Sequence, residues 1–295
     1  MYILYLISVV MCIRHIFDVV SNQLRYRISK IQFGLLNSNK PHIPYMETHL
    51  CDHCNLNCKG CAVLSPLVTE PTFTDLEQYT QDIRTLSKKL AVRKIRLMGG
   101  EPLLHSQIND FIRITREAYP HSEIVVVTNG LLLPKMPETF WATLRKYRIR
   151  IHWSKYPSLK NRFDEIYTCL KEHHTLLEYP DSLNICTENF YVFSSFSPEG
   201  TENPERAFKG CTSRGCVNLY RGKLYTCPAC YVFRANEYFH ANHEVPEGWD
   251  IYKYSGKELQ SFVNKPIPFC RFCHHAVHRK SFPWEVSKRK AEEWM

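Results

Sequence analysis

The chain has 295 residues, of which 44% are hydrophobic and 23% are charged, and its formal net charge at pH 7 is +9. This composition is typical of a folded globular protein and excludes a disordered or low-complexity chain. The positive charge points to an anionic substrate, a membrane surface or a nucleic acid. Because the sequence has no arginine-rich run, RNP-like strand or two-Cys two-His finger, we expect no nucleic acid as a partner.

The first 43 residues are expected to form a separate amphipathic and basic segment. Apolar residues recur with helical spacing from Ile3 to Val20, and a basic stretch without acidic residues follows up to Lys40. This segment lacks the basic leader and cleavage site of a signal peptide, and it is too short to cross a bilayer. We expect the helix to pack on the protein, with weak contact to an anionic membrane surface as the alternative.

The chain contains 13 cysteines, an unusually high and odd number. Disulfides would require an oxidising compartment, and no export signal is found. We therefore expect a cytoplasmic protein in which the cysteines are reduced and serve as metal ligands.

From residue 44 onward, strands and helices alternate. Strands are expected at 44–50, 94–98, 123–130 and 148–153, and helices at 72–90, around 111–114, at 137–147 and at 162–173. The first of these helices is expected to begin with a capping box from Thr74 to Glu77. Such alternation predicts an α/β fold with a parallel sheet, in an open or closed barrel, and places the chemistry at the carboxyl ends of the strands.

The character of the sequence changes near residue 200. The turn-rich stretch before this point has no hydrophobic period, and six cysteines follow between residues 211 and 273. We therefore expect a first domain over residues 44–200 and a small cysteine-rich α+β domain over residues 201–295.

Four cysteines lie close together just after the first expected strand, at positions 51, 54, 58 and 61. A zinc site needs a longer gap between its two CxxC pairs than the three residues found here, and a disulfide needs an oxidising compartment. An iron-sulfur cluster suits a short loop, because neighbouring thiolates can bind different irons. The spacing favours iron-sulfur over zinc and leaves both open.

The pattern Cys54-x3-Cys58-x2-Cys61 after the first strand resembles the cluster motif of the radical SAM superfamily. The resemblance implies a partial (β/α)6 TIM-like barrel in which these three cysteines ligate a 4Fe-4S cluster. The fourth iron then binds S-adenosylmethionine, and one electron from the cluster cleaves it to a 5'-deoxyadenosyl radical that abstracts hydrogen. Cys51 and His53 lie outside this set; we expect a buried or site-lining thiol and a loop-packing ring.

Three further strand ends resemble parts of the same family. The sequence LMGGEP matches the family's GGEP motif, which implies contact with the amino group of S-adenosylmethionine. The ends of the next two strands imply weaker contacts to the same ligand, with ordinary turn roles equally open. The residues so assigned are Gly99, Gly100, Glu101, Pro102, Thr128, Asn129 and Ser154.

The second cysteine group resembles the auxiliary-cluster domain of radical SAM enzymes known as the twitch or SPASM type. The resemblance implies one auxiliary 4Fe-4S cluster, with zinc as the alternative filling. The four expected ligands are Cys211, Cys227, Cys270 and Cys273. Cys216 and Cys230 are surplus and are alternative ligands. The stretch around Gly222 is expected to form a hairpin that delivers Cys227.

The resemblance implies a radical SAM enzyme, an oxidoreductase or modifying enzyme whose auxiliary cluster assists an oxidation. Its substrate is unidentified: a small or sugar-like molecule is favoured over a peptide. The expected reductant is a protein such as flavodoxin or ferredoxin. The alternatives are a glycyl-radical activating enzyme, which usually has extra cysteines just after the first motif, and a non-catalytic zinc-binding interaction protein. The sequence identifies no general acid or base; Tyr156, Tyr220 and Tyr225 are candidates without further support.

Overall fold

The computed structural model describes residues 31–178, 189–191, 199–211, 213–227, 248–273 and 281–295. The chain divides into two compact units, Met1–Lys40 and Pro41–Met295. In the first unit the described residues are 31–40, of which 31–36 are helical. The expected amphipathic helix from Ile3 to Val20 lies outside the described residues. Within the described ranges, no helix combines the length and apolar character needed to cross a bilayer.

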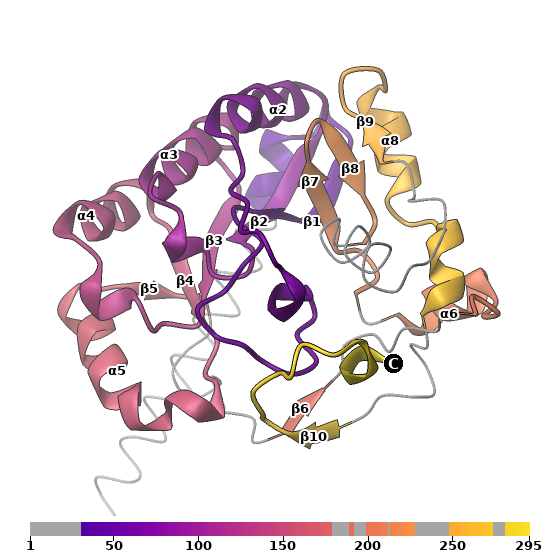
Figure 1. Cartoon of the computed structure of the whole chain (residues 1–295). Coiled ribbons are helices and arrows are strands. Elements are labelled where there is room, and N and C mark those ends of the chain that lie inside the picture. Colours follow the sequence, from indigo (N-terminus) through magenta and orange to yellow (C-terminus); the bar gives the residue numbers. More distant parts are fainter. Residues whose placement is uncertain (1–30, 179–188, 192–198, 212, 228–247, 274–280) are drawn as a thin grey trace, which may run out of the picture. The chain divides into compact units, whose positions relative to one another are not determined.

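A mixed sheet forms the centre of the second unit (Figure 1). In the described part of the chain it has eight strands in the order β5-β4-β3-β2-β1-β7-β8-β9. The strands from β5 to β7 in this order run parallel, and β8 and β9 continue the sheet antiparallel. Their bounds are β1 His42–His49, β2 Ala91–Met98, β3 Glu123–Thr128, β4 Arg150–Trp153, β5 Leu176–Leu177, β7 Val217–Tyr220, β8 Lys223–Tyr225 and β9 Trp249–Asp250.

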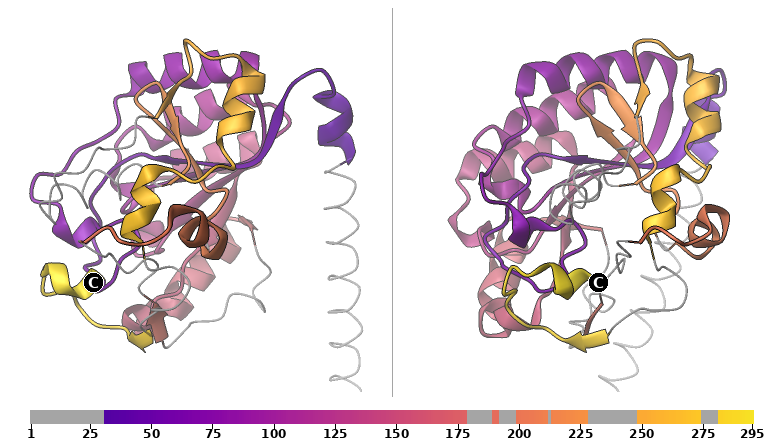
Figure 2. Two further views of the ribbon diagram at one scale, coloured as in Figure 1. Left: turned by 90° about the vertical axis from the view of Figure 1, so that its right-hand side faces the viewer. Right: turned by 45° about the vertical axis from the view of Figure 1, so that its right-hand side comes forward.

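Four helices connect the parallel strands and line one face of the curved sheet (Figures 1 and 2). They are α2 Leu76–Lys89, α3 Ile108–Ala118, α4 Glu138–Tyr147 and α5 Phe163–Glu172. Each places apolar side chains toward the sheet, as the helical spacing predicts. This βα alternation gives the expected α/β fold with a curved, open parallel sheet, consistent with a partial barrel.

The remaining elements are short. The helices are α6 Pro204–Gly210 and α8 Gly256–Phe262, and a second small sheet pairs β6 Asn189–Tyr191 with β10 Ser281–Pro283. Short 3-10 helices are η1 Ser65–Leu67, η2 Pro102–Leu104, η3 Leu133–Lys135, η4 Pro157–Arg162, η6 Pro268–Phe272 and η7 Ala291–Trp294.

The expected capping box at the start of α2 is wrong. Asp75 is the N-cap, and its side chain accepts a hydrogen bond from the Gln78 amide at 2.7 Å. The Thr74 hydroxyl instead donates to the His49 carbonyl at the end of β1, at 2.7 Å. Because β1 takes this hydroxyl, the neighbouring aspartate caps the helix.

The cysteine-rich C-terminal half contributes to the same sheet as the first half. β7 and β8 form the expected hairpin, whose turn residues Arg221 and Gly222 have φ values of 45° and 74°. β7 pairs in parallel with β1 at Met46 and Glu47. The expected domain boundary near residue 200 stays a prediction, since this strand continues the sheet formed by residues before it.

Two apolar cores form in the second unit. The larger one lies between the sheet and the helices α2 to α5. The smaller one joins the segment after the first cysteine loop to the C-terminal region and consists of Leu64, Leu67, Phe269, Phe272, Cys273 and Trp294, with Cys61 and Cys227 packed against it. The two cysteine groups therefore meet the same small core.

Candidate functional site

The first cysteine loop follows the carboxyl end of β1 and lies against the end of β2. The amide of Gly100 donates to the Cys51 carbonyl at 3.0 Å, and the amide of Glu101 donates to the His53 carbonyl at 2.9 Å. Cys51 is 3% exposed, and its thiol donates to the Glu101 carbonyl at 3.0 Å. The structure thus confirms Cys51 as a buried thiol that attaches the loop to β2.

The two glycines of the GGEP sequence make this close approach possible. A Cβ atom on Gly99 would lie 2.3 Å from the Cys51 carbonyl oxygen, and one on Gly100 would lie 1.8 Å from that of His53. Gly99 also has a φ of 151°, which side chains rarely adopt. The glycines therefore serve the packing of the cysteine loop on the sheet; their expected contact with S-adenosylmethionine stays a prediction.

Hydrogen-bond donors are directed at two of the three motif sulfurs. The Leu56 amide and the Asn129 side-chain amide lie 3.4 and 3.6 Å from Cys54 Sγ. The indole Nε1 of Trp284 lies 3.2 Å from Cys58 Sγ. N–H donors stabilise thiolate charge, so this surrounding suits sulfurs that are ionised when they bind metal.

The three motif thiols lie within electrostatic range of each other. Burial raises the pKa of Cys58 to about 12, and the neighbouring Cys61 thiolate adds to this rise while Trp284 opposes it. Burial also raises the pKa of Cys54 far above its usual range, helped by Glu101, Cys61 and Cys58. Bound iron would supply the positive charge that these thiolates need.

The donor set fits an iron-sulfur cluster. In the described residues, no three His, Cys, Asp or Glu side chains converge on one point where a single metal ion would bind. The ligands of a cluster need not converge, because each binds a different iron. Three thiols in one short loop, with Cys58 buried and Cys54 and Cys61 partly buried, match this requirement. N–H donors are directed at the sulfurs of Cys54 and Cys58.

Glu101 joins the ends of β2 and β3. Its side chain is 1% exposed and accepts hydrogen bonds from the Thr128 hydroxyl at 2.7 Å and the Asn129 amide at 2.9 Å. The Leu103 amide donates to the same carboxylate at 3.2 Å. Burial raises the pKa of Glu101 to about 7, against the lowering effect of these donors. The structure thus gives the carboxylate three partners within the protein, and its expected pairing with an ammonium group stays a prediction.

The other predicted strand-end residues meet at the same edge of the sheet. The side-chain amide of Asn129 donates to Asn55 Oδ1 in the cysteine loop at 2.7 Å. The Ser154 amide donates to the Thr128 carbonyl at 2.9 Å, which places the end of β4 beside that of β3. Pro102 is buried at the start of η2. Four of the seven predicted strand-end residues contact the cysteine loop, namely Gly99, Gly100, Glu101 and Asn129. Thr128 bonds to Glu101 and Ser154 to Thr128, so these two join the same group indirectly. The ligand contacts of all seven stay predictions.

Tyr156 lies within electrostatic range of the three motif thiols, which the sequence did not predict. Burial of its hydroxyl raises its pKa well above the usual range, and the thiolates of Cys58, Cys61 and Cys54 add to the rise. The residue follows β4 immediately before η4. Its position beside the thiols makes it the strongest of the three candidate tyrosines for contact with a bound ligand.

The C-terminal segment also reaches the cysteine loop, and no sequence motif predicted this (Figure 1). The Ser287 amide donates to the Asn57 carbonyl at 2.8 Å, and the Lys59 amide donates to the Glu285 carbonyl at 3.0 Å. The indole of Trp294 donates to the Cys61 carbonyl at 2.9 Å. The loop is therefore held from two sides, by β2 and by residues 284–295.

The second cysteine group is partly assembled. Burial raises the pKa of Cys273 far above its usual range, and the neighbouring Cys270 and Cys211 thiolates contribute to the rise. Burial also raises the pKa of Cys216 to about 12, and the negative charges of Glu47 on β1 and of the Cys211 thiolate add to this rise. Cys227 packs against the small core that contains Cys273. Cys230 lies outside the described residues, so the choice among the surplus ligands stays open to experiment.

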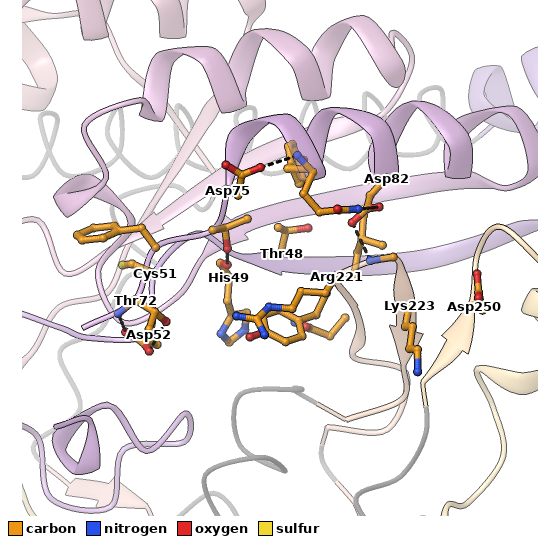
Figure 3. A pocket seen from close by; sticks show the side chains of 18 of the residues that line it. Thr48, His49, Cys51, Asp52, Thr72, Asp75, Asp82, Arg221, Lys223 and Asp250 are labelled. Carbon is orange, nitrogen blue, oxygen red and sulfur yellow. Dashed lines mark hydrogen bonds between the residues drawn. The ribbon is translucent and has the colours of Figure 1, made fainter. Parts of the chain in front are cut away.

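A cavity of about 680 Å³ opens where β1 and β7 separate (Figure 3). The two strands pair only as far as Glu47 and Asn218, and the residues beyond this point line the cavity together with α2 and the β7–β8 turn. Both signs of charge surround it: four aspartates, Asp52, Asp75, Asp82 and Asp250, and two basic residues, Arg221 and Lys223.

Asn218 is the polar residue most deeply buried in this lining. Its side chain is 1% exposed, and its amide Nδ2 finds no hydrogen-bond partner within the part of the chain that the structure describes. A buried amide without a partner costs free energy, about 1–3 kcal/mol. A bound polar molecule with an acceptor atom would remove this cost.

A second polar group lies on strands β2 and β4 and just after β5. The carboxylate of Glu178 accepts hydrogen bonds from Lys94 at 2.6 Å, from Arg96 at 2.7 Å and from His152 at 2.8 Å. Burial alone would raise the pKa of Glu178, but these three partners lower it well below its usual range. These hydrogen bonds and ion pairs link β2 and β4 to the residue that follows β5.

Comparison with known protein families agrees with the site. Residues 49–153 match the family model described as the radical SAM superfamily. GTP 3',8-cyclase of Petrotoga mobilis is 33% identical over 96 residues, which are 32% of this chain and 29% of that protein. The protein of the same name from Heliobacterium modesticaldum is 26% identical over 156 residues, or 48% of this chain and 46% of that protein. The chain thus spans less than half the length of these relatives.

The fold is similar to a solved structure over a longer range. The crystal structure of BtrN in complex with AdoMet and 2-DOIA aligns with a TM-score of 0.50 at 16% sequence identity, covering 80% of this chain and 94% of that chain. The similarity extends beyond the residues matched by the family model into the cysteine-rich C-terminal half. At this level of identity the similarity concerns the fold.

Proposed function

We propose that this chain, which belongs to the radical SAM superfamily through residues 49–153, is an enzyme that cleaves S-adenosylmethionine reductively and abstracts hydrogen from a polar small molecule. In this proposal Cys54, Cys58 and Cys61 hold a 4Fe-4S cluster. The cluster, when bound, supplies the electron for the cleavage and an open iron position for the sulfonium compound.

The observation that supports the proposal most is the placement of the motif cysteines at the carboxyl end of β1. The donors from Leu56, Asn129 and Trp284 favour ionised sulfurs in this loop. The residues after β2 and β3 contact the loop, and the Glu101 carboxylate links the ends of these two strands. These groups hold the loop in one geometry, which a reaction at a bound cluster requires.

We further propose that Cys211, Cys270 and Cys273 hold an auxiliary 4Fe-4S cluster with Cys227 as the fourth ligand. The electrostatic coupling of the first three thiols supports this assignment. Cys227 packs against the small core that contains Cys273. Cys216 is the competing ligand, because the Cys211 thiolate contributes to the raised pKa of Cys216. An auxiliary cluster at this place would accept an electron from the substrate during an oxidation.

The cavity beside β1 and β7 is the proposed substrate site. Its volume of about 680 Å³ suits a small molecule, and its lining includes Cys51, close to the first cysteine group. The charged and amide side chains around it favour a polar ligand with several hydrogen-bonding groups, such as a sugar-like molecule. A peptide remains the alternative that the experiment below tests.

The cofactor assignment is tested by anaerobic reconstitution with iron and sulfide. The reduced protein is expected to convert S-adenosylmethionine to methionine and 5'-deoxyadenosine. Replacing Cys54, Cys58 and Cys61 together by serine should abolish this cleavage and leave the iron of the auxiliary site. Cys169→Ser on α5 is the matched control, since that cysteine lies outside both groups. Cleavage that survives the triple replacement would refute the assignment.

The substrate assignment is tested by thermal-shift screening of the reconstituted protein against polar small molecules and short peptides. Small molecules that stabilise the protein should lose this effect in Asn218→Leu, which keeps the side-chain size and removes the amide. Cleavage of S-adenosylmethionine without substrate should be unchanged in this variant. Stabilisation by peptides alone, retained in Asn218→Leu, would contradict the proposed cavity.

A further inference from the structure

Trp284 contacts the first cysteine group from a distant part of the chain. Its indole Nε1 lies 3.2 Å from Cys58 Sγ, and Cys58 is 6% exposed. For comparison, the side-chain N–H of Asn129 lies 3.6 Å from Cys54 Sγ.

The backbone on both sides of Trp284 is fixed to the loop. Lys59 donates its amide to the Glu285 carbonyl at 3.0 Å, and its ammonium pairs with the Glu285 carboxylate at 2.8 Å. Val286 forms an isolated β-bridge with Cys58. These contacts hold the indole at the sulfur, so that the N–H direction is set before any metal binds.

We infer that Trp284 is a positioning residue that raises the reduction potential of the cluster bound through Cys58. This inference rests on the proposed function. A hydrogen bond to a ligand sulfur stabilises the more negative, reduced state of an iron-sulfur cluster more than the oxidised state. Removing the N–H should therefore make the cluster harder to reduce.

Removing the whole indole would change the space beside the sulfur as well as the hydrogen bond, so the test must remove the N–H and retain a ring. Trp284→Phe removes the donor and keeps an aromatic side chain. Incorporation of 3-benzothienylalanine at position 284 replaces the N–H by sulfur within the same bicyclic shape, and it serves if the phenylalanine variant folds poorly.

Trp294→Phe is the matched control. Trp294 belongs to the same C-terminal segment and donates its indole N–H to the same loop, but to the Cys61 carbonyl at 2.9 Å. Its replacement disturbs the contact between this segment and the loop without removing a donor to sulfur. A change that arises from loosening alone would appear in both variants.

The experiment is an anaerobic redox titration of the full chain followed by electron paramagnetic resonance. The signal of the first cluster is identified by its change when S-adenosylmethionine is added. We expect the midpoint potential to become more negative in Trp284→Phe and in the benzothienyl variant, and to stay unchanged in Trp294→Phe. An unchanged potential in the position-284 variants, or equal shifts at both positions, would overturn the inference.

The failure of the proposed function gives a different result. If wild-type protein binds no iron that depends on Cys54, Cys58 and Cys61, the proposed function itself fails, and the inference with it. If wild-type protein shows the first cluster and only the potential is insensitive to position 284, the inference alone fails.

Discussion

Gly100→Ala tests how the cysteine loop is held. The new Cβ atom would lie 1.8 Å from the His53 carbonyl oxygen and 2.9 Å from the Cys54 amide nitrogen. Ordinary contact needs roughly 3.5 Å, so the loop must retreat by roughly 1.7 Å. This movement breaks the hydrogen bonds from Gly100 to Cys51 and from Glu101 to His53, which are 3.0 and 2.9 Å long. The backbone angle at Gly100 is not left-handed, so the effect is steric.

Two lost backbone hydrogen bonds cost about 2 kcal/mol of unfolding free energy. Displacement of a reacting group by about 1 Å can reduce the rate roughly 100-fold. We therefore expect Gly100→Ala to lower the unfolding free energy in urea by about 2 kcal/mol and to slow 5'-deoxyadenosine formation about 100-fold.

Gly34→Ala is the control, because a Cβ atom there meets nothing within 4 Å. It should leave the cleavage rate near the wild-type value and raise the unfolding free energy by at most about 1 kcal/mol, the ordinary gain for alanine in a helix. A Gly100→Ala protein with wild-type stability and cleavage rate would show that the loop does not depend on this contact, and the packing argument would be refuted.

Further predictions concern the charges, a helix cap and the metal. Glu178→Gln should lower the unfolding free energy by about 2 kcal/mol, since Lys94, Arg96 and His152 lose their shared carboxylate; urea unfolding measures this. Because the folded-state pKa of Glu178 is lowered, its contribution is complete above its ordinary value of 4.5 and is lost as the pH falls below it. The stability difference between wild type and Glu178→Gln should therefore shrink as the pH falls below 4.5, and parallel stability curves in this range would contradict this. Asp75→Ala should cost about 1 kcal/mol by removing the cap of α2, whereas Thr74→Val should leave the helix cap intact. Removal of iron by a chelator under reducing conditions should lower the melting temperature of wild type, and an unchanged melting temperature would show that the clusters do not brace the fold.

The positions of most elements followed from local patterns. The hydrophobic spacing predicted the helices α2, α4 and α5, and apolar runs predicted the strands β1 to β4. These signals are local, because a helix or strand that buries one face repeats its apolar residues with the period of that element. The start of α2 was predicted wrongly, since a contact between Thr74 and the distant strand β1 decided which residue caps the helix.

The sequence by itself predicted the chemistry that we propose for the first site, because three cysteines and a GGEP sequence within about fifty residues are readable as a motif. Only the tertiary structure decided why two glycines stand there: the cysteine loop lies on them, and no local pattern records that contact. It also placed β7 beside β1, which creates the cavity around Asn218, and it brought Trp284 to Cys58. Such contacts join residues far apart in the chain, and their energy comes from the fold as a whole, so short-range sequence patterns do not contain them.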